Sequence, residues 1–134
     1  MNKIPAIISS ITTEGSLSLV TALAGGISFS AIVVDNPATA PNLLTGNGVN
    51  LLFKENELVI ARNFTGMISM LNKIDCVVKS VENGKILSSI KLSFLNFEIT
   101  SLITAKSALQ MQLEAGDRVT AMIKTNEISL SYHD

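Results

Sequence analysis

The chain contains very few of the side chains from which catalytic and metal sites are usually built. Its 134 residues include one cysteine, one histidine and no tryptophan. The histidine, His133, lies beside the C-terminal end, where fraying is the default. Metal clusters need several cysteine or histidine ligands, and a serine triad needs a well-placed histidine. We therefore expect neither an enzyme nor a directly coordinated metal ion.

The single cysteine also bears on compartment and reactivity. Cys76 cannot form an internal disulfide, which fits a reducing compartment and predicts a cytoplasmic protein. It lies in a strand-like run, so a buried apolar role is favoured over a nucleophilic one. No apolar run reaches the roughly 18 residues that a membrane-spanning helix needs, and we expect no insertion into a membrane.

Charge is scarce and almost balanced. Charged residues make up 16% of the chain, with ten Lys and Arg against eleven Asp and Glu, whereas apolar residues make up 47%. A nucleic-acid partner would require a basic groove and stacking aromatic side chains, but the chain has one tyrosine and five phenylalanines. The composition therefore predicts a packed domain that does not bind nucleic acid.

The sequence repeats itself at an offset of 70 positions without a gap. Residues 2–4 and 72–74 both read NKI, and residues 54–57 and 124–127 read KENE and KTNE. In all, 13 of the pairs that begin at residues 2 to 61 are identical. A single ungapped match over a whole half indicates a duplication.

The duplication suggests how the chain divides into domains. We expect a first domain at residues 1–63, a linker at residues 64–71 and a second domain at residues 72–134. Units of this size are small but lie within the range that folds.

Each repeat has the pattern of a small β-domain. Apolar and polar residues alternate in residues 27–34 and 97–104, and turn-forming residues separate the strand-like runs. One short segment in each repeat is helix-like, at residues 37–44 and 106–113, before the fourth strand. We predict an all-β chain, a tandem duplication of a small five-stranded OB-like barrel with one short helix in each copy. Another small barrel or a sandwich is the alternative.

A group of hydrogen-bond donors is predicted where the third strand of the second repeat ends. The run LITAKSALQ (residues 102–110) places Thr104 and Ser107 three residues apart, with Lys106 between them, and Lys124 ends the next strand. Donors without carboxylates suit a small oxyanion and repel cations. Ser107 could instead cap the short helix, and the sequence leaves both interpretations open.

The first repeat serves as a control within the same chain. Val34 stands at the position of Thr104, Pro37 at that of Ser107 and Glu55 at that of Thr125. These differences remove two hydroxyls and add a negative charge. Hydroxyls needed only for the fold would be expected in both copies, so the asymmetry favours a ligand at the second repeat.

The second half resembles a known family. The runs ISMLNKIDCVVKSVENGKILSSIKLSF, ITSLITAKS and LEAGDRVTAMIKTNEISL are similar to the Mop or TOBE domain, a molybdenum-binding OB-like module, and the first half resembles a more divergent copy. In that family the module occurs as small free-standing proteins and as the tail of transport ATPases and of a molybdate-responsive repressor. The resemblance covers essentially the whole chain as a tandem pair.

The resemblance implies a ligand and a site. It implies binding of molybdate or tungstate as an oxyanion, without an organic cofactor, at contacts between barrels, and hence a homo-oligomer. The family's Thr-x-x-Ser pattern falls on Thr104 and Ser107, and its lysine with a small residue falls on Lys124 and Thr125. Its Ser-x-Arg-Asn segment falls on Ser69, Met70, Leu71 and Asn72, so that a leucine stands at the arginine position. Lys106 would add long-range attraction, and Lys54 could contribute a second half-site.

Two functions follow as hypotheses. The first is an intracellular oxyanion-binding protein for molybdate or tungstate that acts in storage, homeostasis or sensing and is linked to molybdate transport. The second is a ligand-free assembly module that docks on a transporter ATPase or a transcription regulator. Ligand-dependent stabilisation distinguishes them, because only the first predicts it.

Overall fold

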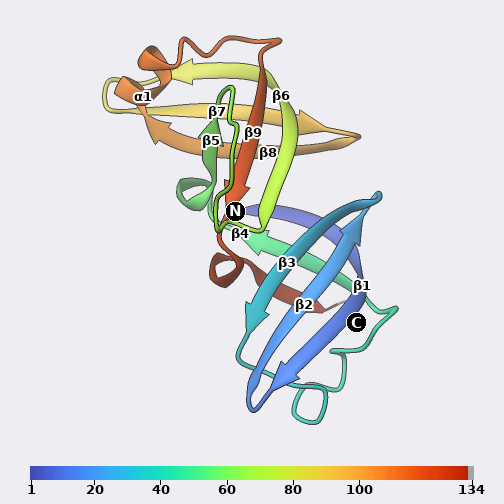
Figure 1. Ribbon diagram of the computed structural model, residues 1–134. Helices are drawn as coiled ribbons and strands as arrows, with labels where there is room; N and C mark the ends of the chain where they lie inside the picture. Colours follow the sequence, from blue (N-terminus) through green and yellow to red (C-terminus); the bar gives the residue numbers. More distant parts are fainter. Residues whose placement is uncertain (133–134) are drawn as a thin grey trace.

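Two five-stranded antiparallel sheets, one above the other, make up the computed structural model of this chain, which describes residues 1–132 (Figure 1). His133, the histidine discounted above, lies outside the described residues. The first sheet contains, in spatial order, β10 (Ser129–Tyr132), β4 (Gly48–Phe53), β1 (Asn2–Glu14), β2 (Leu17–Ala24) and β3 (Ile27–Val33). The second contains β5 (Val59–Ala61), β9 (Arg118–Ile123), β6 (Asn72–Asn83), β7 (Leu87–Phe94) and β8 (Phe97–Thr104). The predicted all-β class is confirmed.

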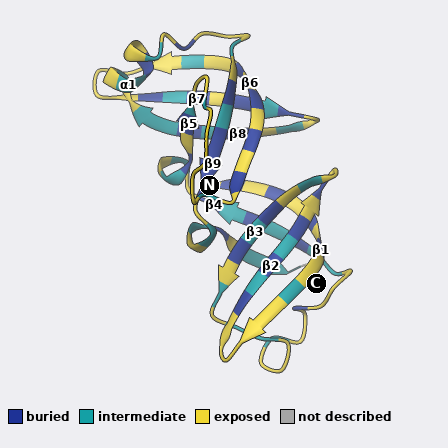
Figure 2. Ribbon diagram, in the orientation of Figure 1, coloured by how far each residue is buried: buried dark blue, intermediate teal, exposed yellow. Residues whose placement is uncertain are grey.

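The long first strand of each repeat curls its sheet. In β1 every second side chain from Asn2 to Ile8 is buried, as the alternation of apolar residues predicts (Figure 2). The first half of β1 pairs with β4 and the second half with β2, and the register shifts between Ile8 and Ser10. The equivalent shift in β6 lies between Val78 and Ser80. Such bulges bend a strand and increase its twist, so one strand can serve both sides of a curled sheet.

The helix predicted for both repeats is present only in the second. There α1 (Ala105–Gln110) lies between β8 and β9, but residues 37–44 of the first repeat form turns. The Oδ1 atom of Asn36 accepts hydrogen bonds from the N–H groups of Ala38 at 2.9 Å and Thr39 at 3.1 Å, which holds a turn in place of a helix. Pro41 has no N–H and disfavours helical geometry at the residue before it. The prediction of one helix in each copy is therefore wrong for the first copy.

The two repeats exchange their last strands. After the short 3₁₀ turn η1 (Glu55–Glu57), the chain crosses to the second sheet, where β5 pairs with β9. After the equivalent turn η2 (Thr125–Glu127), β10 returns to the first sheet and pairs with β4. The division at 1–63, 64–71 and 72–134 stays a prediction from the sequence repeat, and each sheet takes its fifth strand from the other repeat. The buried apolar residues accordingly form one continuous core.

Two equivalent asparagines hold the repeats together. Asn2 exchanges hydrogen bonds of 2.8 Å with the backbone N–H and C=O of Thr100 on β8. Asn72 does the same with Ser30 on β3, at 2.7 and 2.9 Å, and also donates to the carbonyl of Ile123 at 3.1 Å. Each side-chain amide therefore pairs with the backbone N–H and C=O groups at the edge of the opposite sheet, as a neighbouring strand would.

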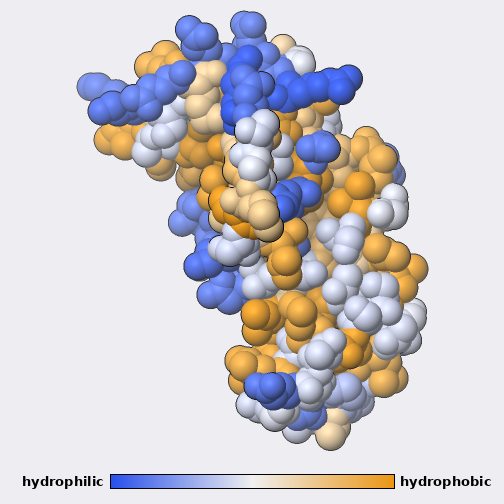
Figure 3. Space-filling model, in the orientation of Figure 1, coloured by the Kyte–Doolittle hydropathy of each residue, from blue (hydrophilic) through white to orange (hydrophobic). Residues whose placement is uncertain are grey.

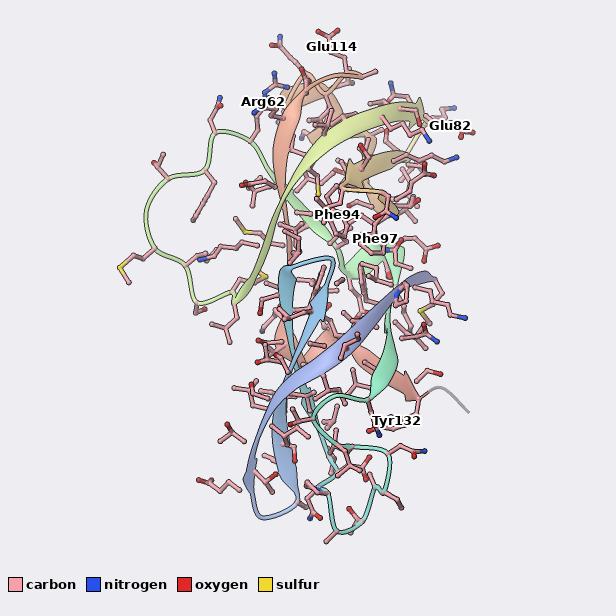
Figure 4. The ribbon with its side chains drawn as sticks, turned by 90° about the vertical axis from the view of Figure 1, so that its right-hand side faces the viewer. Arg62, Glu82, Phe94, Phe97, Glu114 and Tyr132 are labelled. Carbon is pink, nitrogen blue, oxygen red and sulfur yellow. The ribbon has the colours of Figure 1, made fainter. Side chains whose placement is uncertain are left out.

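An arginine fixes the end of the exchanged strand β5. The Nη1 atom of Arg62, labelled in Figure 4, donates to the carbonyls of Met111 at 2.9 Å and Gln112 at 3.2 Å, and to the carboxylate of Asp117 at 2.8 Å. Hydrogen bonds from the Glu114 amide and from Arg62 hold the pKa of Asp117 below its ordinary value. β5 is thereby tied to the loop between α1 and β9. Among residues 1–132, no helix is long and apolar enough to cross a bilayer.

Candidate functional site

The predicted hydroxyl pair lies together at the end of β8, and we call Thr104, Lys106 and Ser107 the hydroxyl corner. Thr104 is extended, with φ −68° and ψ 146°, and caps α1 by accepting a hydrogen bond from the Ser107 N–H at 3.0 Å. Its hydroxyl lies 2.9 Å from the Ser107 hydroxyl oxygen, to which it donates. The capping residue is thus Thr104 and not Ser107, because the helix begins at Ala105.

Some hydrogen-bond donors of the hydroxyl corner already donate to other groups of the chain. The N–H of Ala105 donates to the carbonyl of Ile86 at 2.8 Å, and the N–H of Ser107 is bonded to Thr104. The hydroxyl hydrogen of Ser107 and the ammonium of Lys106 have no hydrogen-bond partner within residues 1–132. Both side chains lie where an anion could reach them, since Lys106 is exposed and Ser107 half-buried.

A second group forms where β9 ends and β6 begins, and we call Asn72, Lys124 and Thr125 the lysine corner. Asn72 pairs with Ile123, the residue before Lys124. Lys124 is exposed and precedes η2, and Thr125 is its first residue. The side-chain amide of Asn72 is fully engaged in the three hydrogen bonds described above, so the free donors here are those of Lys124 and Thr125.

The remaining predicted site residues precede β6. Ser69 and Leu71 are exposed and Met70 is half-buried, in the segment that connects β5 to β6. The side chain of Leu71 is 61% exposed, so the leucine at the family's arginine position is not needed for the core. Because Asn72 follows Leu71 directly in the sequence, this segment leads into the lysine corner.

The two corners do not meet within one chain. The strand β8, which carries the hydroxyl corner, packs against η1 of the first repeat, whereas η2, next to Lys124, packs against β3. A hydrogen bond of 2.6 Å from the Ser101 hydroxyl to the Leu58 carbonyl marks the first of these contacts. Figure 1 likewise shows α1 at the far end of the upper sheet from the junction with the lower one.

Lys54 lies on the side of the hydroxyl corner. It is exposed and precedes η1, the turn that packs against β8. The residue after it is Glu55, a carboxylate at the position that Thr125 holds in the second repeat. The lysine of the first repeat is therefore followed by a negative charge, which opposes an anion there.

Glu57 and Glu127, equivalent residues of the two repeats, interact across the junction. Burial raises the pKa of Glu127, and a hydrogen bond with Glu57 and the charge of Glu57 raise it further, while Lys124 lowers it. A raised pKa in the folded state means that the native protein binds this proton more tightly than the unfolded chain does. The stabilisation is present at low pH and is lost as the pH rises through the folded-state pKa.

We therefore expect Glu127→Gln to raise the melting temperature at neutral pH, because it removes a repulsive charge. The gain should shrink towards zero as the pH falls below the raised pKa of Glu127, because this carboxyl is then protonated in wild type. Thermal melts across this pH range test the prediction, with Glu82→Gln, an exposed glutamate near the end of β6, as the matched control. An equal gain at every pH would contradict it.

Cys76 is not available as a nucleophile. Its side chain is buried, and burial raises the pKa of the thiol to about 12. The predicted apolar role is consistent with this burial. Within residues 1–132 no group of three or more His, Cys, Asp or Glu side chains could hold a metal ion.

Comparisons with known proteins agree with two OB-like units. Residues 68–130 match the TOBE domain. Among solved structures, the chain is similar to the cytoplasmic molybdate-binding protein ModG, crystallised with molybdate bound, with 23% identity and a TM-score of 0.92 over 98% of this chain and 96% of that one. A molybdate binding protein from Sporomusa ovata is 32% identical, with a TM-score of 0.43 over 44% of this chain and 88% of that chain. No curated protein matches this chain.

These matches define a TOBE domain match in the second repeat and an OB-like fold for the chain as a whole. The match to the TOBE domain over residues 68–130 agrees with the resemblance seen in the sequence, and the whole chain shares the tandem OB-like fold of ModG. The matched range contains both corners and residues 69–71, and leaves out only Lys54 among the predicted site residues.

Proposed function

We propose that this chain is a cytoplasmic binding protein for molybdate or the closely related tungstate. The observation that carries the proposal is the hydroxyl corner, which lies in the repeat that matches the TOBE domain and is replaced by Val34 and Pro37 in the other repeat. Support for the ligand comes from ModG, whose structure is described with molybdate bound and which shares the fold over nearly the full length.

The chemistry of the two corners suits a tetrahedral oxyanion. Its oxygens accept hydrogen bonds, and the Ser107 hydroxyl and the Thr125 hydroxyl are donors. Thr104 would turn its hydroxyl from Ser107 to the ligand. Lys124 and Lys106 would offset the double negative charge, and Ser69 lies in the segment leading to Asn72. No residue would coordinate the metal atom itself.

Self-association is part of the proposal. Since the hydroxyl corner and the lysine corner lie at different places in one chain, a site that uses both would require a second copy. In such a site Thr104 and Ser107 of one protomer would face Lys124 and Thr125 of another. This arrangement would make ligand binding and assembly support each other.

Thermal shift measurements test the ligand. We expect molybdate and tungstate to raise the melting temperature, with the free energy of stabilisation growing logarithmically with free ligand, by about 2.7 kcal/mol at a hundredfold excess over Kd. Sulfate and phosphate serve as controls and should have a smaller effect. An equal response to all four anions, or to none, would contradict the proposal.

A ligand-free assembly module remains the second candidate, and one observation favours it. Many large apolar side chains are exposed, including Ile7, Met67, Leu71 and Leu109. Under this alternative the chain would dock on a molybdate transporter or a regulator, and its mass by light scattering would not depend on molybdate. Storage, homeostasis and sensing would all need the oxyanion.

A further inference from the structure

A cleft on the outer face of the second sheet is separate from both corners, and we call it the charged cleft. It has a volume of about 910 Å³, and small-molecule sites typically measure roughly 300–1,000 Å³. The strands β6, β7 and β9 supply polar lining residues, among them Asp75, Ser93 and Arg118. No residue of the hydroxyl corner or of the lysine corner lines it.

Apolar side chains line the rest of the charged cleft. Phe94 is 6% exposed, and its ring packs against that of Phe97 with a centroid distance of 5.3 Å, close to the junction of the two sheets (Figure 4). Phe64 comes from the segment that connects β5 to β6, and Ile27 comes from the first repeat, and both are half-buried. The cleft therefore combines aromatic and aliphatic walls with a few polar groups, as small-molecule sites do.

The charged cleft contains one carboxylate and one guanidinium that do not pair with each other. Asp75 lies opposite Thr120 in the pairing of β6 with β9, and Arg118 lies two residues before Thr120. The two charged residues are therefore diagonal neighbours on one face of the sheet, about 7–8 Å apart. Both are exposed, and neither side chain makes an ion pair or a hydrogen bond within residues 1–132. This arrangement leaves room between them for a group that carries both charges.

The first repeat lacks both charges at the equivalent positions. Pro5 corresponds to Asp75 and Gly48 to Arg118, and both line a smaller groove of about 420 Å³ on the first sheet. Among residues 1–132, no charged residue lines that groove. Figure 3 shows hydrophilic residues gathered over the upper part of the molecule, whereas the lower part is mostly hydrophobic or neutral. The outer sheet face of this fold thus forms without the two charges, which favours a ligand as the reason for them.

A leucine of the charged cleft has a backbone conformation that usually requires glycine. Leu95, in the turn between β7 and β8, has a φ of 51°, and its equivalent in the first repeat is Gly25, with a φ of 58°. A side chain in this left-handed region strains the backbone, and such strain gathers at ligand sites. The Leu95 side chain is 62% exposed, so burial in the core does not explain its presence. It is explained if the side chain forms a wall against a bound molecule.

We propose that the charged cleft binds a free α-amino acid with an aromatic side chain. Its carboxylate accepts hydrogen bonds from Arg118, and its ammonium donates to Asp75. Its ring lies against Phe64 and Leu95. A ligand with only a carboxylate would meet the uncompensated charge of Asp75, and a ligand with only an ammonium would meet that of Arg118. The inference goes beyond the proposed function and does not depend on the oxyanion.

Isothermal titration calorimetry with the full chain tests the class of ligand. We expect phenylalanine to bind with a Kd of about 1 mM or below. N-acetylphenylalanine lacks the ammonium and phenylalanine amide lacks the carboxylate, so each should bind at least about tenfold more weakly. Glycine keeps both charges but has no ring, and it should also bind more weakly. No binding of phenylalanine would overturn the inference, and so would equal binding of N-acetylphenylalanine, which would indicate a peptide C-terminus instead.

Two variants test which residue recognises which charge. Asp75→Asn should weaken phenylalanine binding about tenfold and remove its advantage over N-acetylphenylalanine, whereas Arg118→Gln should remove its advantage over phenylalanine amide. Glu82→Gln is the matched control, because Glu82 is an exposed carboxylate of the same strand β6 outside the cleft, and it should bind phenylalanine as wild type does. An unchanged preference in either cleft variant would contradict the proposal.

Leu95→Gly separates the wall of the charged cleft from the stability of the fold. The variant copies Gly25 and relieves the left-handed strain, so the melting temperature should hardly change, whereas phenylalanine should bind several-fold more weakly. Unchanged affinity would contradict the placement of the ligand against Leu95. Molybdate titrations on the same variants should match wild type, because Asp75, Leu95 and Arg118 lie outside both corners. The proposal of an amino-acid site and that of an oxyanion site can therefore fail independently.

Discussion

Replacing Thr104 by valine and Ser107 by alanine should weaken molybdate binding by about a hundredfold or more. Each hydroxyl would donate a hydrogen bond to a charged ligand, and such bonds contribute about 1.5–3 kcal/mol each. A loss of 1.4 kcal/mol corresponds to about tenfold in Kd, so two bonds together account for the expected change. Isothermal titration calorimetry with molybdate measures it.

The design separates binding from folding. Thr104 also caps α1, and loss of a cap costs about 1 kcal/mol of stability, so the titration is made well below the melting temperature of the variant. Thr12→Val is the control, because Thr12 is exposed on β1 of the first repeat and outside both corners. Unchanged molybdate affinity in the double variant would remove the observation on which the proposed function rests.

Asn72→Ala should be the most destabilising single substitution at the junction of the repeats. Asn72 is 1% exposed, and its loss leaves the N–H and C=O of Ser30 and the C=O of Ile123 without these hydrogen bonds. Each unsatisfied buried group costs about 1–3 kcal/mol. We expect a loss of roughly 3 kcal/mol or more and a fall in melting temperature of roughly 10 °C, measured by calorimetry in the absence of any oxyanion.

Two control variants show whether the effect comes from the hydrogen bonds that Asn72 makes between the repeats. Asn2→Ala removes two hydrogen bonds instead of three and should destabilise the chain less. Asn126→Ala, in the exposed turn η2, should have almost no effect. If Asn72→Ala left stability unchanged but reduced molybdate binding, Asn72 would act mainly as a site residue and not in holding the two repeats together.

The prediction of the fold depended on the duplication, and the duplication also produced its one error. The helix-like segment at 106–113 corresponds to α1, and the equivalent segment at 37–44 was expected to match it. Asn36 and Pro41 prevent this, because the first holds a turn through its side chain and the second lacks an N–H. The two segments thus occupy equivalent positions in the repeats but differ in local conformation.

The role of the candidate site residues stays a prediction, but the expected proximity of Thr104 and Ser107 is present in the structure. The spacing of Thr104 and Ser107 brought both hydroxyls to one turn, since residues three apart lie on the same face at a helix start. The distance between that turn and Lys124 depends on how the sheets pack and could not be read from spacing. The buried role of Asn72 was missed for the same reason, although the repeated NKI at residues 2–4 and 72–74 was a visible signal.

The sequence by itself determined that the chain is a duplicated β-protein, which residues face the core, and where the hydroxyls lie along the second repeat. Only the tertiary structure decided that β5 and β10 change places between the sheets. The alternation of apolar residues specifies which face of a strand is buried, but it does not specify which of two similar sheet edges the strand joins. Because the repeats are alike, either pairing satisfies the same pattern, and contacts such as Asn72 with Ser30 belong to the exchanged arrangement alone.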